Sequence, residues 1–166
     1  IQAHRGAGIA WSENTLEAFR HAWKIGATPE ADLRTTKDGM IICFHDKNLA
    51  RVASNADDAH KKMGVEQLAL AEVEQFDVGS FRGQQFAGQR APTLKSVFAE
   101  MKGRPERWLY LDIKTAELEP LVKLIREYGL EHQVLFTTTH HRLIRDWKKR
   151  MPESMTLLWN GGTQEE

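Results

Sequence analysis

The sequence predicts an α/β fold, in which parallel strands are covered by helices. Short apolar segments of strand length alternate with segments whose apolar residues recur at helical spacing, and several strand candidates end in charged residues or histidine. Six strand candidates can be counted along 166 residues, a length that suits one domain. A complete eight-stranded (β/α) barrel typically needs about 250 residues. We therefore expect either an open sheet or a barrel that lacks two strands.

The first elements are a short strand and a helix. Residues 1–6 form the strand candidate, which ends in His4 and Arg5 before a glycine. A helix follows the next loop, with Asn14 as the expected N-cap and a glutamate three residues later that completes a capping box. Glu13 and Asn14 are therefore assigned to helix capping rather than to catalysis.

The second strand carries the most informative pair of residues. Glu30 and Asp32 stand two residues apart in an extended segment, so their side chains point to one face and can share a cation. Asp112, at the end of a strand over 108–114, would complete a set of three carboxylates; the alternative is a plain ion pair with Lys114. Carboxylate oxygens suit Mg²⁺ or Ca²⁺ better than Zn²⁺.

A hairpin is expected directly after this strand. A turn at residues 36–39, which contains Asp-Gly, joins it to an apolar strand over 40–44, and an antiparallel pairing would place His45 roughly opposite Asp32. The connection is too short for the helix that normally separates parallel neighbours, so the barrel should depart from its regular form here. Asp46 is expected to orient His45.

The middle of the chain has a weaker pattern than its flanks. Residues 49–90 are interpreted as an insertion, after the third strand, that lies over the strand ends, and residues 65–76 within it are expected to be helical. Beyond it the alternation resumes. The expected elements are a helix over 92–101, a strand over 108–114, a helix over 118–128, a strand over 133–139, a helix over 143–151 and a strand over 156–159.

Two histidines and two cations complete the candidate site. His4 and His45 each end a strand, where the catalytic groups of (β/α) barrels collect. A histidine can accept or donate a proton near neutral pH, so general acid and base catalysis is expected; metal ligation or a structural hydrogen bond is the alternative. Arg5 and Lys114 would direct positive charge to the same face, which is what a phosphoryl group developing negative charge requires.

Composition excludes several classes of partner. Lys and Arg together number 23, as do Asp and Glu, so no net charge favours nucleic acid or an anionic membrane surface. No apolar segment reaches the length of a transmembrane helix, about 18 residues. The single Cys43 excludes an intrachain disulfide and a cysteine zinc cluster, but it leaves the compartment open between the cytoplasm and the periplasm or secretion.

Six segments carry a family resemblance: HRG, SENTLEAFRHAWKIGA, EADLRTTKDG, FHD, APTL and LYLDIK. In this order they resemble the glycerophosphodiester phosphodiesterases, over nearly the whole chain. The resemblance implies a TIM barrel that uses a divalent cation, Mg²⁺ or Ca²⁺, to cleave glycerophosphodiesters into glycerol 3-phosphate and an alcohol. The residue roles that it implies are acid and base for His4 and His45, metal binding for Glu30, Asp32 and Asp112, and phosphate binding for Arg5 and Lys114.

The resemblance also bears on the extent of the domain. It implies that residues 49–90, with the segment FDVGS, cover the site and contact the glycerol end of the substrate. Residues 1–166 are expected to form a single barrel domain, truncated on its C-terminal side, with about six of eight strands. Exposed sheet edges should make the isolated chain unstable or prone to self-association.

Two other functions remain open at this point. A phospholipase D-like enzyme, akin to sphingomyelinase D, resembles the same HRG and carboxylate motifs; the long insertion after His45 and the absence of paired cysteines favour the glycerophosphodiester reading. Alternatively, the chain is a catalytically idle barrel fragment that acts in binding or assembly. The intact set of histidines and carboxylates speaks against that function.

Overall fold

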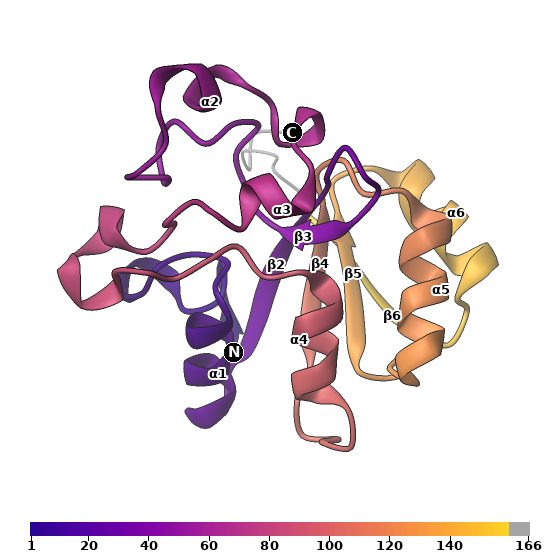
Figure 1. Ribbon diagram of the computed structural model, residues 1–166. Coiled ribbons are helices and arrows are strands. Elements are labelled where there is room, and N and C mark those ends of the chain that lie inside the picture. Colours follow the sequence, from indigo (N-terminus) through magenta and orange to yellow (C-terminus); the bar gives the residue numbers. More distant parts are fainter. Residues whose placement is uncertain (160–166) are drawn as a thin grey trace, which may run out of the picture.

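A six-stranded sheet with helices on its outer face organises the fold, as the computed structural model of residues 1–159 shows (Figure 1). Five strands run parallel in the order β1-β2-β4-β5-β6, and β3 pairs antiparallel with β2 alone. The α/β class and the incomplete (β/α) barrel are thereby confirmed. The strands are β1 (Gln2–Ala3), β2 (Thr28–Thr35), β3 (Ile41–Cys43), β4 (Leu109–Ile113), β5 (Val134–Thr138) and β6 (Met155–Leu158).

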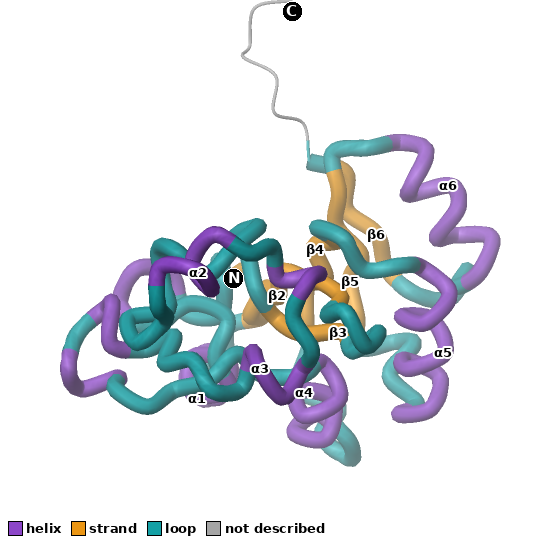
Figure 2. Tube along the Cα trace, turned by 45° about the horizontal axis from the view of Figure 1, so that its top comes forward, coloured by secondary structure: helices purple, strands orange, loops and turns teal. Residues whose placement is uncertain are grey.

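Four longer helices pack against the outer face of this sheet, and Figure 2 shows them arranged around it. They are α1 (Leu16–Lys24), α4 (Leu94–Met101), α5 (Leu118–Tyr128) and α6 (His141–Arg150), each at a predicted position. Their apolar faces meet alternate strand residues, such as Ala31 and Leu33 of β2, in one buried cluster. The intervening residues, among them Glu30 and Asp32, therefore point to the opposite, inner face.

The register of the sheet brings carboxylates from different strands to the same level. Asp32 of β2 lies directly opposite Asp112 of β4, and Asp112 in turn lies opposite Thr137 of β5. Like charges directly opposite each other on neighbouring strands repel. The sheet thus holds two acidic side chains together at a free-energy cost that a bound cation would offset.

The sheet forks at β2. On one side of this strand β1 pairs with Thr28 and Pro29, whereas β3 pairs with Leu33, Arg34 and Thr35. The residues between the two branches use other partners on that side: Asp32 accepts a hydrogen bond from the backbone N–H of Phe44. The sequence-based pairing of His45 with Asp32 is therefore wrong by one residue. Thr36 N donates to the carbonyl of Met40, which closes a three-residue loop centred on Asp38, within the turn expected at residues 36–39.

Residues 49–90 form short helical turns around a second hydrophobic cluster. The segment contains α2 (Asp58–Lys62), α3 (Leu70–Val73) and three 3₁₀ turns, and its apolar side chains pack with Ile42 of β3 and with Phe44, which directly follows β3. The continuous helix predicted over 65–76 is wrong, because Leu68 and Ala69 take extended backbone angles. Figure 1 shows α2 and α3 beyond the end of β2 from which β3 begins. Among the described helices, none combines the length and hydrophobicity needed to span a membrane.

Candidate active site

Three carboxylates form a cluster on the inner face of the sheet. Oxygen atoms of Glu30, Asp32 and Asp112 all lie within 4.8 Å of one another. Burial, together with the charges of Asp32 and Asp112, raises the pKa of Glu30. Oδ1 of Asp32 is buried, and Lys114 Nζ lies 3.2 Å from it as an ion-pair partner. A cluster of this kind fits a divalent cation, because several carboxylate oxygens that converge on one point are the hard ligands that Mg²⁺ or Ca²⁺ binds.

Two cationic side chains border this cluster. Lys114 Nζ lies 2.9 Å from Asp112 Oδ2 and 3.2 Å from Asp32 Oδ1. Burial opposes the charged form of Lys114, but the hydrogen bond to Asp112 and the charge of Asp32 outweigh it, so its pKa is raised. Arg5 Nε lies 3.9 Å from Asp32 Oδ2, and the backbone N–H of Arg5 donates to Glu30 Oε2 at 3.1 Å. Arg5 therefore fixes one carboxylate with its backbone and faces another with its side chain.

The turn after β1 brings His4 and Arg5 into this position. Gly6, which ends the HRG segment, has a φ of 106°, and a Cβ placed on it would lie 2.9 Å from the Cβ of Ala18 in α1. Only glycine combines this backbone angle with so close an approach to the helix. The side chain of His4 is 67% exposed, with Nε2 3.8 Å from Glu30 Oε2.

The ring of His45 is held at both nitrogens. Nδ1 lies 2.8 Å from Asp46 Oδ1, and Nε2 lies 2.8 Å from Arg5 Nη2. A guanidinium can only donate, so Nε2 accepts in this arrangement and the ring proton resides on Nδ1, where the Asp46 carboxylate accepts it. His45 is thereby oriented by Asp46, with an unprotonated nitrogen directed toward Arg5.

Asn14 is a site residue that sequence reasoning misassigned. The N-cap of α1 is Thr15, whose hydroxyl accepts a hydrogen bond from the backbone N–H of Ala18 at 3.2 Å. Asn14 instead donates to Asp32 Oδ2 at 2.7 Å and accepts from the backbone N–H of Asp32 at 3.0 Å. The sequence did contain a signal for this role. Asn14 and Thr15 are both residue types that cap helices, and one helix needs a single N-cap, so one of the two side chains is available for another contact.

Glu13, also assigned to capping, contacts two arginines. Its carboxylate accepts from Arg5 Nη1 at 3.2 Å and from Arg51 Nη1 and Nη2 at 2.8 and 2.6 Å. Arg51 also donates to Asp46 from Nε at 2.7 Å and from Nη2 at 3.1 Å. Arg51 belongs to the segment interpreted as an insertion, so this segment contributes a side chain directly to the surroundings of His45.

Arg34 is a further residue that the sequence reasoning did not assign. Its Nε and Nη2 donate to the backbone carbonyl of His45 at 3.0 and 2.9 Å, and its Nη1 donates to Glu66 at 2.8 Å. The spacing contained the signal, because Arg34 follows Glu30 and Asp32 at intervals of two and so shares their face of the strand.

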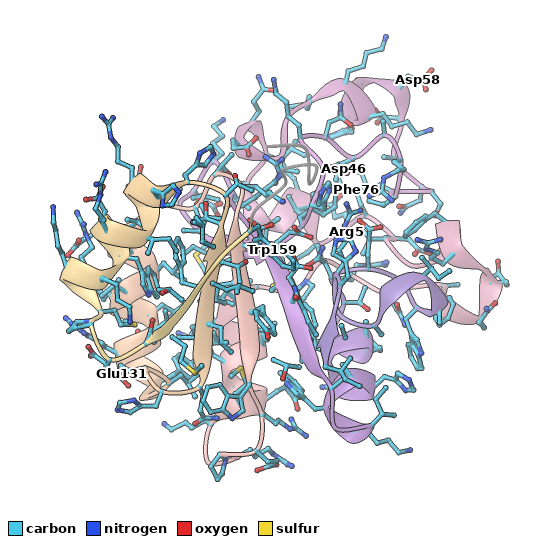
Figure 3. The ribbon with its side chains drawn as sticks, turned by 180° about the vertical axis from the view of Figure 1, so that it is seen from behind. Arg5, Asp46, Asp58, Phe76, Glu131 and Trp159 are labelled. Carbon is cyan, nitrogen blue, oxygen red and sulfur yellow. The ribbon has the colours of Figure 1, made fainter. Side chains whose placement is uncertain are left out.

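The structure brings all the sequence-predicted site residues together around the inner face of the sheet, at the level of Glu30 and Asp32 in the middle of β2 and of Asp112 near the carboxyl end of β4. Figure 3 shows Arg5 and Asp46 on the same side of β2, and His45 links the two because it contacts both. The predicted set comprises His4, Arg5, Glu30, Asp32, His45, Asp112 and Lys114. Three of these supply the carboxylate cluster, two are the histidines, and two are cations that face the cluster.

Comparison with known proteins agrees with this geometry. The model of the Glycerophosphoryl diester phosphodiesterase family matches residues 4–164. A glycerophosphodiester phosphodiesterase from Caldanaerobacter subterraneus subsp. tengcongensis is 34% identical over 99% of this chain and 68% of its own length.

Two solved structures share the fold. A glycerophosphoryl diester phosphodiesterase from Parabacteroides distasonis has a TM-score of 0.80 and 27% identity, over 98% of this chain and 55% of that chain. A phosphodiesterase from Oleispira antarctica, solved in complex with the product sn-glycerol-3-phosphate, has a TM-score of 0.79 and 25% identity, over 93% of this chain and 63% of that chain. This chain belongs to the glycerophosphoryl diester phosphodiesterase family.

Proposed function

We propose that this protein hydrolyses glycerophosphodiesters to glycerol 3-phosphate and an alcohol, with a divalent cation as cofactor. The observation that carries the proposal is the placement of a three-carboxylate cluster beside two histidines and two cations on the inner face of the sheet. Family membership supports it, as does the Oleispira antarctica relative, which was solved with sn-glycerol-3-phosphate.

Glu30, Asp32 and Asp112 are the proposed ligands of the cation, Mg²⁺ or Ca²⁺. When bound, the cation polarises a phosphoryl oxygen and offsets the negative charge that develops there. Arg5 and Lys114 add positive charge from two sides of the same position. Arg5 donates to His45 in the present structure. We propose that it turns to the substrate phosphate on binding and so frees the lone pair of Nε2.

His45 is the proposed base of the first step, and His4 the proposed acid. His45 Nε2 removes the proton of the substrate's glycerol hydroxyl, whose oxygen attacks phosphorus while the bond to the leaving alcohol breaks. His4 donates a proton to the leaving oxygen. Water then opens the resulting cyclic phosphate as the two histidines exchange roles, which gives glycerol phosphate.

Chelation tests the metal dependence. Hydrolysis of glycerophosphocholine should stop in EDTA and return when Mg²⁺ or Ca²⁺ is added in excess, and comparing the two ions identifies the more effective one. The variant Asp112→Ala should need more metal for half-maximal activity, because it lacks one of three ligands. Unchanged hydrolysis in EDTA would contradict the metal role.

A substrate with an aromatic leaving group tests the proton roles. A p-nitrophenyl phosphodiester of glycerol releases a weakly basic phenolate that needs no protonation, so His4→Ala should retain most of its first-step activity on it. His45→Ala should be inactive on both substrates, because the base is still required. Equal losses for the two variants on this substrate would contradict the assignment.

A further inference from the structure

The charged side chains around His45 form a closed ring. Asp46 contacts Nδ1 of His45, Arg51 bridges Asp46 to Glu13, Glu13 accepts from Arg5, and Arg5 returns to Nε2 of His45. Two guanidiniums face two carboxylates in this ring, so its charges balance around a neutral imidazole. We propose that Arg51 is a positioning residue, which holds Asp46 against Nδ1 and thereby fixes the tautomer and the orientation of His45.

Arg51 has the geometry that this role requires. It makes two hydrogen bonds to each carboxylate, and Glu13, at 7% exposure, has little access to water as a substitute partner. Burial opposes ionisation of Glu13 and Asp46, yet their hydrogen bonds to Arg51 and its charge lower the pKa of both carboxyl groups. Without Arg51, Asp46 would lose the bonds that keep Oδ1 directed at the imidazole, and the buried charge of Glu13 would have only Arg5 as partner.

Arg51 is itself held by the segment 49–90. Its neighbours Leu49 and Val52 are buried in the second hydrophobic cluster, and its guanidinium lies 5.6 Å from the ring centroid of Phe81. This aromatic contact is of the cation–π type. The segment therefore determines where Arg51 stands, and through Arg51 it sets the orientation of His45.

A second metal site is the competing explanation for this cluster. Atoms of Glu13, His45 and Asp46 lie within 4.8 Å of one another. Both carboxylates are already paired with guanidiniums, however, and the cavity that these residues line holds about 10 Å³, room for about one water molecule. The observations thus favour an arginine-held histidine over a second cation.

The tautomer of His45 can be measured without any enzyme assay. Ring ¹⁵N NMR at about pH 8, above the ordinary histidine pKa near 6.5, distinguishes a protonated Nδ1 from a protonated Nε2. The His45→Gln spectrum assigns the signals by their absence. Wild-type protein should show Nδ1 protonated and Nε2 unprotonated. Arg51→Ala should show signals averaged between the two tautomers, and a wild-type tautomer in a folded Arg51→Ala protein would overturn the proposal.

Two further variants make the test specific. Arg51→Lys keeps the positive charge but cannot make two hydrogen bonds to each carboxylate, so it should shift the tautomer balance of His45 less than Arg51→Ala does. If Arg51→Ala does not fold, the comparison of Arg51→Lys with wild-type protein tests the proposal. Arg82→Ala is the matched control. Arg82 belongs to the same segment and its guanidinium also lies over Phe81, at 5.3 Å from the ring centroid, but among the described contacts it has none with the charged side chains that surround His45. It should leave the His45 spectrum unchanged, and a spectrum altered as strongly as in Arg51→Ala would contradict a specific role for Arg51.

The kinetic consequence rests on the proposed function. Arg51→Ala should lower kcat for glycerophosphocholine by about 10- to 100-fold with little change in KM, because a misplaced base slows chemistry more than binding. If the wild-type protein does not hydrolyse this substrate, the proposed function fails while the NMR result still decides the role of Arg51. A change confined to KM would count against a positioning role. Added Zn²⁺, a diamagnetic ion, that shifts the His45 signals in wild-type protein whose three-carboxylate cluster is already saturated with Mg²⁺ would instead indicate the second metal site.

Discussion

Replacing Asn14 tests whether a side chain outside the carboxylate cluster supports the proposed metal site. Asn14→Ala removes a hydrogen bond to the carboxylate of Asp32, which contributes about 1.5 to 3 kcal/mol to the free energy of unfolding. It also leaves the buried backbone N–H of Asp32 unpaired, which costs about 1 to 3 kcal/mol more. Asn14 also has a φ of 52°, a conformation that costs alanine about 1 to 2 kcal/mol. Because such terms overlap, we expect a total loss of about 3 to 5 kcal/mol in the free energy of unfolding.

Asn14→Gly separates these causes. Glycine tolerates the positive φ but lacks the amide, so this variant should lose the hydrogen bonds without the backbone strain and should be more stable than Asn14→Ala by about 1 kcal/mol. For a domain of this size, 1 kcal/mol corresponds to about 2 to 4 °C in Tm. Thermal denaturation of the two variants beside the wild type measures both differences. Equal stability of Asn14→Ala and Asn14→Gly would contradict the contribution of strain.

The effect on metal binding is the functional half of this prediction. An Asp32 carboxylate that has lost its hydrogen-bond donor is less well oriented, and such supporting residues typically change metal affinity by about 10- to 100-fold. Calorimetric titration with Mg²⁺ and Ca²⁺ at low temperature, where both variants remain folded, should show this loss in both variants. If both keep the wild-type affinity, the reasoning that Asn14 positions Asp32 is refuted.

Three other predictions concern stability and assembly. Trp147 is fully buried and stacks on Phe136 at 4.4 Å, so Trp147→Ala should lower the free energy of unfolding by about 3 to 5 kcal/mol in urea denaturation, and Trp147→Phe by less. Burial opposes ionisation of Asp77, but hydrogen bonds from Ser80 and backbone amides outweigh it and hold its pKa below the usual range. Its contribution to stability is therefore present above about pH 4 and lost as the pH falls through the folded pKa, so Asp77→Asn should flatten the pH dependence of stability below about pH 4. Finally, β6 has no partner on its outer side among the described residues, so the 166-residue chain should elute from a size-exclusion column in a concentration-dependent way; a stable monomer at all concentrations would contradict this.

The features predicted correctly are those that local periodicity determines. The helix over 118–128 has the same bounds in the structure, because its apolar stripe and its terminal Gly129 are both local signals. Glu30 and Asp32 share a face because side chains alternate along any strand. That Asp112 joins them follows from two strands ending at the same edge of a parallel sheet.

The features missed depend on contacts between distant segments. The sequence around Asn14 is compatible with a helix cap, and only the docking of its loop against β2 makes Asp32 its partner. Arg51 lies in a segment without clear periodicity, so nothing local connects it to His45. The predicted hairpin register was wrong by one residue. Asp-Gly is compatible with hairpin loops of two or three residues, and the loop length determines whether His45 or Phe44 lies opposite Asp32.

The fork at β2 ties the two halves of the site to the backbone of a single residue. The carbonyl of Asp32 accepts from Phe44, the residue before His45, while its N–H donates to Asn14, whose own N–H donates to the carbonyl of Arg5. Any movement of Asp32 must therefore carry the proposed base and the proposed phosphate-binding arginine with it. The proposed metal position and the proposed proton transfer are thus mechanically coupled through the backbone of one residue, so amide hydrogen exchange at Asp32 and Phe44 should rise or fall together.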